Sequence, residues 1–174
     1  MLLKNGAKLH IRKAETKDAQ KILDYLNIVG GESDNLLFGA EGIAMTVEEE
    51  EQFIENTNSS KTSALFIALI EDKIVGTAGV FAPTKERISH QCTVAVSVLK
   101  AFWGTGVGSC LVDEMIRFAR QTKKLEILHL GVKADNTRAI ALYKKFGFRE
   151  IGLYPKFFKI KGKYYDEILM NLYI

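Results

Sequence analysis

The sequence predicts an α/β fold of layered α+β character, in which one mixed sheet of seven strands packs with about four helices. An apolar run at residues 64–70, a short polar turn and a second apolar run at 74–81 are typical of an antiparallel hairpin. A strand at 90–99, a glycine-rich turn, an amphipathic helix and an apolar run at 125–132 come next in βαβ order, which makes their two strands parallel. A sheet that contains both arrangements is mixed.

The chain has 174 residues, of which 47% are hydrophobic and 26% charged, and this balance suits one globular domain covering residues 1–174. The net charge of +3 is spread along the chain, so nothing indicates nucleic-acid binding. Cys92 and Cys110 lack the spacing of a metal or redox motif, so we expect no metal site and two reduced thiols. With no secretory signal and no apolar run of membrane-spanning length, we expect a cytoplasmic protein that binds no membrane.

The first strand is expected at Leu9–Arg12, where apolar and polar side chains alternate. A helix should follow, because apolar residues recur at helical spacing across 22–29 and Thr16 or Asp18 can cap its first turn. Gly30–Gly31 is expected to end this helix, since glycine is common just after a helix C-terminus.

An irregular stretch at 32–45 separates this helix from a second, shorter one. Thr46 followed by Glu49 fits a capping box, in which each side chain binds the other residue's backbone N–H, so the second helix should begin here and run through Asn56. The acidic residues at 48–51 lie at the positive end of this helix, and a solvated helix start accounts for them without an acidic site.

Gly104, Gly106 and Gly108 stand at every second position between the valine-rich strand and an amphipathic helix that runs to Thr122. The first backbone N–H groups of a helix have no intrahelical partner and attract anions, and residues without Cβ atoms let a ligand approach closely. The turn is therefore interpreted as a phosphate or pyrophosphate site, with a tight ligand-free turn as the alternative. It is not a Walker loop, because no lysine follows Gly108. It also matches the dinucleotide-binding fingerprint G-x-G-x-x-G/A poorly, because Ser109 stands at the last position of that pattern.

A second pattern lies after the parallel strands, where Asn136 is a natural N-cap and Gly147 a natural C′ residue of a helix. The apolar face of this helix comprises Ala139, Leu142, Tyr143 and Phe146. Tyr143 therefore points inward, either as a core tyrosine whose hydroxyl finds a backbone partner or as a functional residue.

Two motifs, in this order and at this separation, resemble the signatures of the GCN5-related N-acetyltransferases, the GNAT family. The first motif is Trp103-x-x-Gly106-x-Gly108. The second motif is Asn136-x-x-Ala139-x-x-Leu142-Tyr143-x-Lys145-x-Gly147-Phe148. The order of the elements agrees as well, so the resemblance extends from Leu9 to Leu172, although the family usually has Gln or Arg at the position of Trp103.

This resemblance implies a GNAT fold, with helices on both faces of the sheet and with fourth and fifth strands that are parallel and splayed. Acetyl-CoA would enter the gap between them as cosubstrate, and its pantetheine amides would pair with the fourth strand, where a β-bulge often directs the N–H groups. The residues that the resemblance assigns to acetyl-CoA binding are Val96, Ser97 and Val98 on the strand, Trp103, Gly104, Thr105, Gly106, Val107 and Gly108 in the turn, and Asn136, Ala139 and Tyr143 on the later helix.

The implied activity is transfer of an acetyl group from acetyl-CoA to a primary amine in a direct ternary complex, with a small molecule as the expected acceptor. A strand N–H would stabilise the tetrahedral oxyanion, and Tyr143 would act as the catalytic acid that protonates the leaving thiolate. Acetylation of protein N-termini, as by ribosomal-protein modifiers, and a non-catalytic acyl-CoA-binding sensor are the two alternatives. A homodimer is left open.

The general base is unassigned, because Thr93, or less favourably Cys92, stands where many relatives have a glutamate on the fourth strand. A water molecule held by backbone groups is one substitute. Other candidates are Glu32, Glu41, His90, Asp166 and Glu167. The acceptor side is expected at residues 31–45 and in an aromatic-rich pair of C-terminal strands, 148–157 and 164–173.

Overall fold

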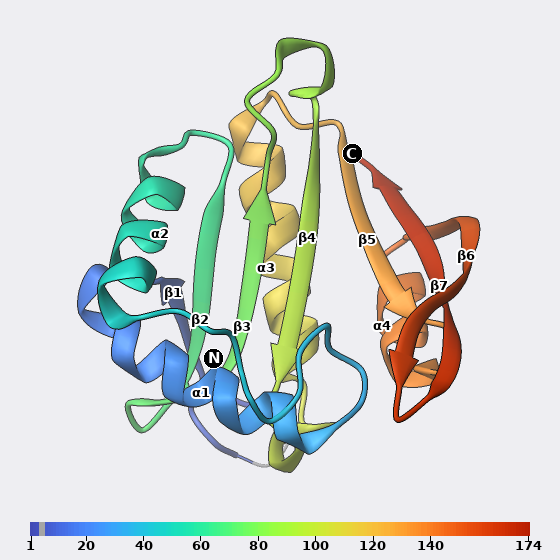
Figure 1. The fold of residues 1–174 in the computed structure, drawn as a ribbon. Helices are drawn as coiled ribbons and strands as arrows, with labels where there is room; N and C mark the ends of the chain where they lie inside the picture. The colour runs from blue at the N-terminus through green and yellow to red at the C-terminus, as the bar shows by residue number, and fades with distance from the viewer. Residues whose placement is uncertain (4–5) are drawn as a thin grey trace.

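The computed structural model describes residues 1–3 and 6–174, and its centre is a seven-stranded sheet with the order β1-β2-β3-β4-β5-β7-β6 (Figure 1). Neighbouring strands are antiparallel except β4 and β5, which are parallel. The mixed seven-stranded sheet predicted from the sequence is therefore confirmed. The strands are β1 (His10–Lys13), β2 (Ala64–Ile70), β3 (Lys73–Phe81), β4 (Gln91–Val98), β5 (Ile127–Lys133), β6 (Arg149–Ile160) and β7 (Lys163–Tyr173).

Helices cover both faces of the sheet, as Figure 1 shows. Those on one face are α1 (Ala19–Glu32) and α2 (Val47–Ser59), and those on the other are α3 (Val107–Thr122) and α4 (Thr137–Lys145). Because successive side chains of a strand point to opposite faces, Ile67 of β2 packs with α1 and α2, whereas its neighbour Phe66 packs against α3. A strand buried on both faces is apolar throughout, which is the pattern of β2.

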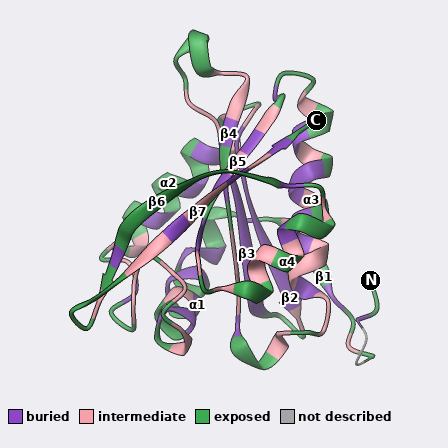
Figure 2. Cartoon of the chain, turned by 90° about the vertical axis from the view of Figure 1, so that its right-hand side faces the viewer, coloured by how far each residue is buried: buried purple, intermediate pink, exposed green. Residues whose placement is uncertain are grey.

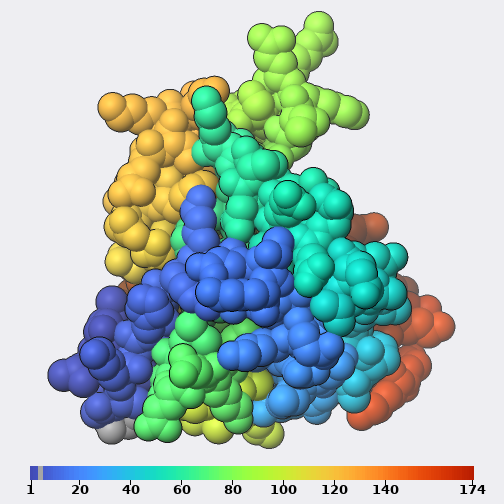
Figure 3. Space-filling view, turned by 90° about the vertical axis from the view of Figure 1, so that its left-hand side faces the viewer, coloured from blue at the N-terminus to red at the C-terminus, as the bar shows by residue number. Residues whose placement is uncertain are grey.

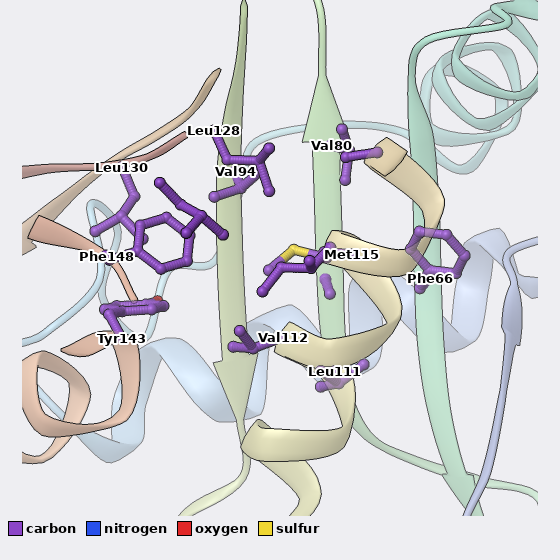
Figure 4. Packing of buried hydrophobic residues seen from close by; sticks show 14 of the residues in the cluster. Phe66, Val80, Val94, Leu111, Val112, Met115, Leu128, Leu130, Tyr143 and Phe148 are labelled. Atoms are coloured by element: carbon purple, nitrogen blue, oxygen red, sulfur yellow. The ribbon is translucent and has the colours of Figure 1, made fainter. Parts of the chain in front are cut away.

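The core on the α3 side holds the glycine turn in place. Leu111, Val112 and Met115 of α3 are fully buried and point towards the sheet, close to Val80 of β3 and Val94 of β4 (Figure 4). Burial of side chains of this size stabilises the packed state by about 2 kcal/mol each. The start of α3 is therefore held firmly beside the end of β4, and the turn that joins them has a defined shape.

α1 continues through Gly30 and Gly31 to Glu32, so the prediction that these glycines end the helix was wrong. The physical reason is packing, because a Cβ atom on Gly30 would overlap the carbonyl oxygen of Gly39 in the following loop. Glycine is needed there for the close approach of the loop and not for helix termination. The irregular loop after α1 is thereby held against the helix.

The caps predicted for α2 and α4 are confirmed. The Thr46 hydroxyl accepts a hydrogen bond from the N–H of Glu49 at 3.2 Å, and the Glu49 carboxylate accepts one from the N–H of Thr46 at 2.8 Å. The Asn136 side chain accepts from the N–H of Ala139 at 3.2 Å, and Gly147 follows α4 with a left-handed φ of 93°. These local motifs therefore define where both helices begin and where α4 ends.

β6 and β7 form a long hairpin at one edge of the sheet. Its turn places Lys161 and Gly162 at left-handed φ values of 49° and 81°. β6 is exposed along most of its length, which Figure 2 shows in green. The opposite side of the molecule is closed, because α1 and α2 form a continuous surface there, blue and blue-green in Figure 3.

Candidate active site

β4 and β5, the parallel pair, separate along their length (Figure 1). They pair at three positions, the last of which joins Thr93 to His129. Beyond that point β4 continues to Val98 against β3, and β5 continues to Lys133 against β7. The splay implied by the resemblance is therefore present. The register between β3 and β4 does not shift, so the suggested β-bulge is absent from this pairing, and strand divergence alone exposes the edge of β4.

The exposed edge of β4 offers backbone hydrogen-bonding groups to the gap. The N–H of Leu99 donates to a carbonyl oxygen of β3 at 3.0 Å. Because successive strand residues direct their backbone groups to opposite edges, Ser97 also faces β3, whereas Val96 and Val98 face the gap. The Ser97 hydroxyl is engaged as well, 2.8 Å from the hydroxyl of Tyr25 on α1. Of the three assigned strand residues, Val96 and Val98 are thus the two whose N–H groups can meet a ligand.

The glycine-rich turn leads from β4 into α3, and its glycines serve two purposes. Gly104 and Gly106 have φ values of 78° and 110°, a left-handed conformation that glycine adopts without strain. Gly108 lies outside that region, and a Cβ atom there would stand 3.3 Å from Leu142 Cδ2 of α4. The first two glycines therefore shape the turn, and the third gives α4 room to approach.

Unpaired N–H groups gather in the second half of this turn. Within the described part of the chain, the N–H groups of residues 106–109 make no hydrogen bond, and they lie at the positive end of the 16-residue α3. The N–H groups of Trp103 and Thr105, by contrast, already donate to carbonyl groups of the preceding turn at 3.1 and 3.4 Å. The side chain of Val107 is buried in the core, so only its backbone is available. The unpaired N–H groups thus also include that of Ser109, which lies beyond the assigned residues.

Trp103 links the strand, the turn and α4. Its indole N–H donates to the carbonyl oxygen of Val98 at 2.8 Å, and the guanidinium carbon of Arg138 lies 4.7 Å from its ring centroid. Arg138 comes from the first turn of α4 and, like Lys145, lines the same pocket as the glycine turn. Sequence reasoning missed both cations. The only signal was their presence within the second motif, on a helix expected to lie near the site.

A pocket of about 1150 Å³ follows the gap from the glycine turn to the C-terminal strands. All the residues assigned to acetyl-CoA line it, except the buried Val107. The two segments expected on the acceptor side also meet here: the loop after α1 contributes Leu36 and Leu37, and β7 contributes Glu167 and Leu169. Residues far apart in the sequence therefore share one cavity.

Tyr143 lies on the inner face of α4, and Figure 4 shows it beside Phe148, with 5.5 Å between the ring centroids. Its hydroxyl makes no hydrogen bond within the described residues, so the backbone partner of a simple core tyrosine is not observed. Burial raises the pKa of Tyr143 to about 12. The hydroxyl therefore stays protonated at neutral pH and can donate a hydrogen bond into the pocket.

The β5–β7 part of the pocket lining includes Glu167 of β7, His129 of β5 and Phe158 of β6. Glu167 is only 8% exposed, and burial raises the pKa of its carboxyl group, an effect that nearby His129 partly opposes. His129 Nδ1 lies 2.8 Å from Asn171 Oδ1, which orients the imidazole ring. A carboxylate and an imidazole in a partly apolar cavity are groups that can bind or deprotonate an amine.

The other base candidates are placed less favourably. Three carboxylates each accept a hydrogen bond from a backbone N–H: Glu32 at 2.6 Å, Glu41 at 2.8 Å and Asp166 at 2.8 Å. Neither they nor His90 belong to the pocket lining in the described part of the chain. Burial raises the pKa of the Cys92 thiol to about 12, and Thr93 lines the pocket without being a base. The sequence alone could not rank these residues as candidate bases, because their distances from the pocket depend on how the strands of the sheet pair.

Comparison with known proteins agrees with this geometry. The model of the acetyltransferase (GNAT) family matches residues 36–148, which is well over half of the chain. The chain therefore belongs to the GNAT family of acetyltransferases, enzymes for which acetyl-CoA is the acetyl donor.

Three similar proteins carry different names. A GNAT-family acetyltransferase from Streptococcus pneumoniae is 34% identical, with a TM-score of 0.94 over 96% of this chain and 100% of that one. A ribosomal-protein-alanine N-acetyltransferase from Brucella melitensis is 26% identical, with a TM-score of 0.82 over 95% of this chain and 99% of that one. The L-amino acid N-acetyltransferase AaaT of Escherichia coli is 31% identical over 60% of this chain and 64% of its own length.

The match to the Escherichia coli relative thus spans slightly less than two thirds of that protein. Among the helices of the described residues, none has the length and apolar character needed to cross a membrane.

Proposed function

We propose that the protein is an N-acetyltransferase that transfers the acetyl group of acetyl-CoA directly to a primary amine within a ternary complex. The observation that carries this proposal is the shared cavity. Free backbone N–H groups lie at one end of it, and a buried carboxylate lies at the other. An anionic cosubstrate and an amine could therefore meet between them without a covalent acyl-enzyme. The raised pKa of both cysteine thiols also argues against a thiolate nucleophile.

The residues present fit the charge and shape of acetyl-CoA. The N–H groups of 106–109 and the positive end of α3 suit its pyrophosphate, and Arg138 and Lys145 add positive charge beside them. Val96 and Val98 offer N–H groups to the pantetheine arm along the edge of β4. Asn136 acts mainly through structure, because its side chain caps α4 and so fixes the position of Tyr143.

Attack by the amine would convert the thioester carbonyl oxygen into an oxyanion, which a gap-facing N–H of β4 can stabilise. The sulfur then leaves with the electrons of the C–S bond. Complete transfer of the Tyr143 proton to sulfur would be uphill, because the pKa of Tyr143 is about 12 and that of a free thiol is ~8.5. We therefore assign Tyr143 as a hydrogen-bond donor to the leaving sulfur, which modifies the expected role of a full catalytic acid.

We further propose that the acceptor is a small primary amine without a carboxylate beside the amine. Glu167 is the charged side chain that the C-terminal strands contribute among the described lining residues, whereas Asp135 precedes α4, and Arg138 and Lys145 lie on α4. A free α-amino acid would bring its carboxylate towards Glu167, where the neighbouring ammonium group of Lys133 is already paired with Asp135. The acceptor in the name of the Escherichia coli relative, an L-amino acid, is therefore not the class we favour here.

A protein N-terminus is the second candidate, for two reasons. A peptide bond replaces the carboxylate of a free amino acid, so the same charge argument admits it. The Brucella melitensis relative is also named for a ribosomal-protein alanine acceptor. A peptide α-amine, with a pKa of ~7.7–8.0, is neutral more often at pH 7 than a lysine-like amine at ~10.4.

Isotope-labelled acetyl-CoA provides the test. The purified protein is incubated with a cell extract separated into small-molecule and protein fractions, and mass spectrometry locates the label. Label on a metabolite amine supports the proposal, and label on protein N-termini supports the second candidate. Tight acetyl-CoA binding with no transfer to either fraction would contradict both and indicate a sensor.

A defined panel then tests the charge argument. Leucine, leucinamide and a peptide beginning with leucine share one side chain and one α-amine, and they differ in the carboxylate, amide or peptide bond attached to the α-carbon. Rates are compared at a pH where all three amines are neutral, so that ionisation of the amine does not contribute. We expect leucinamide and the peptide to exceed leucine at least tenfold in kcat/KM, and equal values would remove the carboxylate argument.

A further inference from the structure

Gly131 of β5 leaves an unusual space at the point where β4 and β5 diverge. It is exposed and belongs to the pocket lining. A Cβ atom built on Gly131 would overlap the carboxylate of Glu167, which reaches across from β7. The carboxylate of Glu167 therefore occupies the position that a side chain on Gly131 would take. A glycine on one strand and a glutamate on the next together put one carboxylate into the gap.

The strand register explains how Glu167 reaches this place. Glu167 pairs with Lys133 of β5, and Gly131 pairs with Leu169 of β7, so all four residues lie on the same face of the sheet. Thr93 of β4 pairs with His129 on that face as well. The carboxylate thus points towards the side of the gap on which the fourth-strand position Thr93 lies.

No cation within the described residues forms an ion pair with this carboxylate. The ammonium group of Lys133, its cross-strand neighbour, lies 2.5 Å from Asp135 Oδ1 and 3.7 Å from the ring centroid of Tyr165. The side chain of Glu167 makes no hydrogen bond or ion pair with any described residue, although the residue is only 8% exposed. A buried carboxylate that is free of partners and faces a pocket is available to a ligand.

We propose that Glu167, seated over Gly131, is the general base that removes the proton from the acceptor amine. This inference rests on the proposed acetyltransferase function. It assigns the role of general base, which Thr93 on the fourth strand cannot fill because its side chain is not basic. In the step, the nitrogen lone pair forms the N–C bond and the C=O electrons move to oxygen, while one N–H proton passes to Glu167. The C=O bond then re-forms, the C–S bond breaks with its electrons on sulfur, and the thiolate takes up one proton. Overall, nitrogen loses one proton and sulfur gains one.

The surroundings make Glu167 a stronger base than an exposed carboxylate. Burial raises its pKa above the ordinary value, so its conjugate acid holds the proton more tightly. The titratable and charged side chains that the strand register places on this face are His129, Lys133, Arg149, Tyr154, Lys163, Tyr165 and Tyr173. Of these, His129 has a resolved influence on Glu167 and lowers its pKa to a smaller extent than burial raises it.

The first test compares Glu167→Gln with Asp166→Asn in steady-state kinetics on an accepted amine and in acetyl-CoA binding. Asp166 is a matched control, because it neighbours Glu167 on β7 but its carboxylate binds the N–H of Lys156. We expect Glu167→Gln to lower kcat at least 100-fold, in the range usual for general bases, with the acetyl-CoA Kd unchanged within twofold. Asp166→Asn should keep kcat within twofold. A Glu167→Gln variant that retains more than a third of wild-type kcat overturns the proposal.

The second test moves the carboxylate. Gly131→Ala should displace Glu167 and lower kcat about tenfold, and circular dichroism verifies that the variant folds. The double variant Gly131→Glu with Glu167→Ala carries a carboxylate from the other strand into the same space, and it should recover at least tenfold over Glu167→Ala alone. Failure to recover in a folded double variant contradicts the placement of the base over Gly131.

The pH dependence of kcat separates Glu167 from His129. In the wild type, kcat should fall as pH drops through the raised pKa of Glu167, and this acid limb should vanish in Glu167→Gln but persist in His129→Gln. The reverse pattern would identify His129 as the base and overturn the proposal. A wild-type protein that binds acetyl-CoA but acetylates no amine would instead refute the proposed function, so the two failures are distinguishable.

Discussion

The two halves of the sheet differ in how they are covered. We call β1–β4 with α1, α2 and α3 the platform, and β5–β7 with α4 the arm. In the platform, β2 and β3 are buried on both faces, whereas β6 of the arm is exposed over most of its length (Figure 2). The platform is therefore close-packed on both sides of the sheet, and the arm buries one face and leaves the other to the pocket.

This difference matches the kind of group that each half contributes to the site. The platform supplies backbone N–H groups, from the edge of β4 and the start of α3, whose positions need a rigid frame. The arm supplies side chains. His129 and Glu167 can face the pocket because no helix of the arm covers their face of the sheet, whereas Tyr143 reaches the pocket from α4 itself. Cosubstrate binding should therefore depend mainly on the platform, with positive charge added by Arg138 and Lys145 of α4, and chemistry should depend on the arm.

The largest expected effect tests the packing of the two halves directly. Ile67 of β2 is fully buried, and Ile67→Ala should lower the free energy of unfolding by about 3–4 kcal/mol through lost burial and a residual cavity. Leu153 of β6 is 56% exposed, and Leu153→Ala should change it by less than ~0.5 kcal/mol. Urea denaturation measures both values. Similar losses in the two variants would mean that the arm is packed as tightly as the platform.

The next largest effect concerns cosubstrate binding by the platform. Gly108→Glu should weaken acetyl-CoA binding about 100-fold, or ~2.7 kcal/mol, because it adds a negative charge among the N–H groups that face the pyrophosphate. Gly108 has no left-handed φ, so it avoids the backbone strain that any substitution of Gly106 would add. Calorimetric titration with acetyl-CoA measures the change.

Gly108→Ala is the matched control for this prediction. Its Cβ would stand 3.3 Å from the flexible end of the Leu142 side chain, so a small shift of that side chain accommodates it. We expect acetyl-CoA affinity within threefold of wild type. Equal loss in the Ala and Glu variants would show that space, and not charge, explains the effect.

A smaller effect is expected for chemistry in the arm. Tyr143→Phe removes the hydroxyl that would donate to the leaving sulfur, and it should lower kcat about 10- to 100-fold, or ~1.4–2.7 kcal/mol. The acetyl-CoA Kd should change less than threefold, because the aromatic ring and its packing on Phe148 remain. Wild-type kcat across the pH range would rule out a role for the hydroxyl.

The smallest expected effect concerns the platform, and it is the pH dependence of the free energy of unfolding. Glu50 of α2 is 2% exposed and has no ion pair or hydrogen bond from its side chain within the described residues, and burial raises the pKa of its carboxyl group. The folded state therefore binds this proton more tightly than the unfolded state, and stability falls as pH rises from the ordinary value of 4.5 through the raised pKa.

Glu50→Gln should consequently raise stability at pH 7 by about 1 kcal/mol, which corresponds to a rise of ~2–4 °C in Tm. At pH 4 the gain should disappear, because the wild-type carboxyl is mostly protonated in both states. Thermal unfolding at the two pH values measures this. Glu51→Gln, an exposed neighbour in the same acidic run, should change the free energy of unfolding by less than ~0.3 kcal/mol at either pH.

Much of the fold follows from patterns within short segments. The continuous apolar run of β2, the capping box at Thr46 and the N-cap at Asn136 each depend on neighbouring residues, so they were predictable. Gly30 and Gly31 show the limit of such reasoning. The same glycine that often ends a helix here admits a loop from outside it, and only the packed structure distinguishes the two uses.

The candidate site divides in the same way. The glycine turn and the tyrosine helix were recognisable because each motif is contiguous in the sequence. Two contacts could not be recognised in this way: Arg138 beside Trp103, and Glu167 over Gly131. Each of them joins residues from separate elements. The sequence also did not indicate that the N–H of Ser97 faces β3 while those of Val96 and Val98 face the gap. The edge that each N–H faces depends on how β3 pairs with β4.

The elements, their order and the two motifs could be predicted from the sequence, because hydrophobic periodicity, capping and turn chemistry act between residues a few positions apart. The position of Glu167 in the pocket could not be predicted in this way. That position depends on the register between β5 and β7 and on the splay of β4 from β5, which arise from packing between distant segments. A glycine on one strand can then make room for a glutamate on the next, and no local pattern records that relationship.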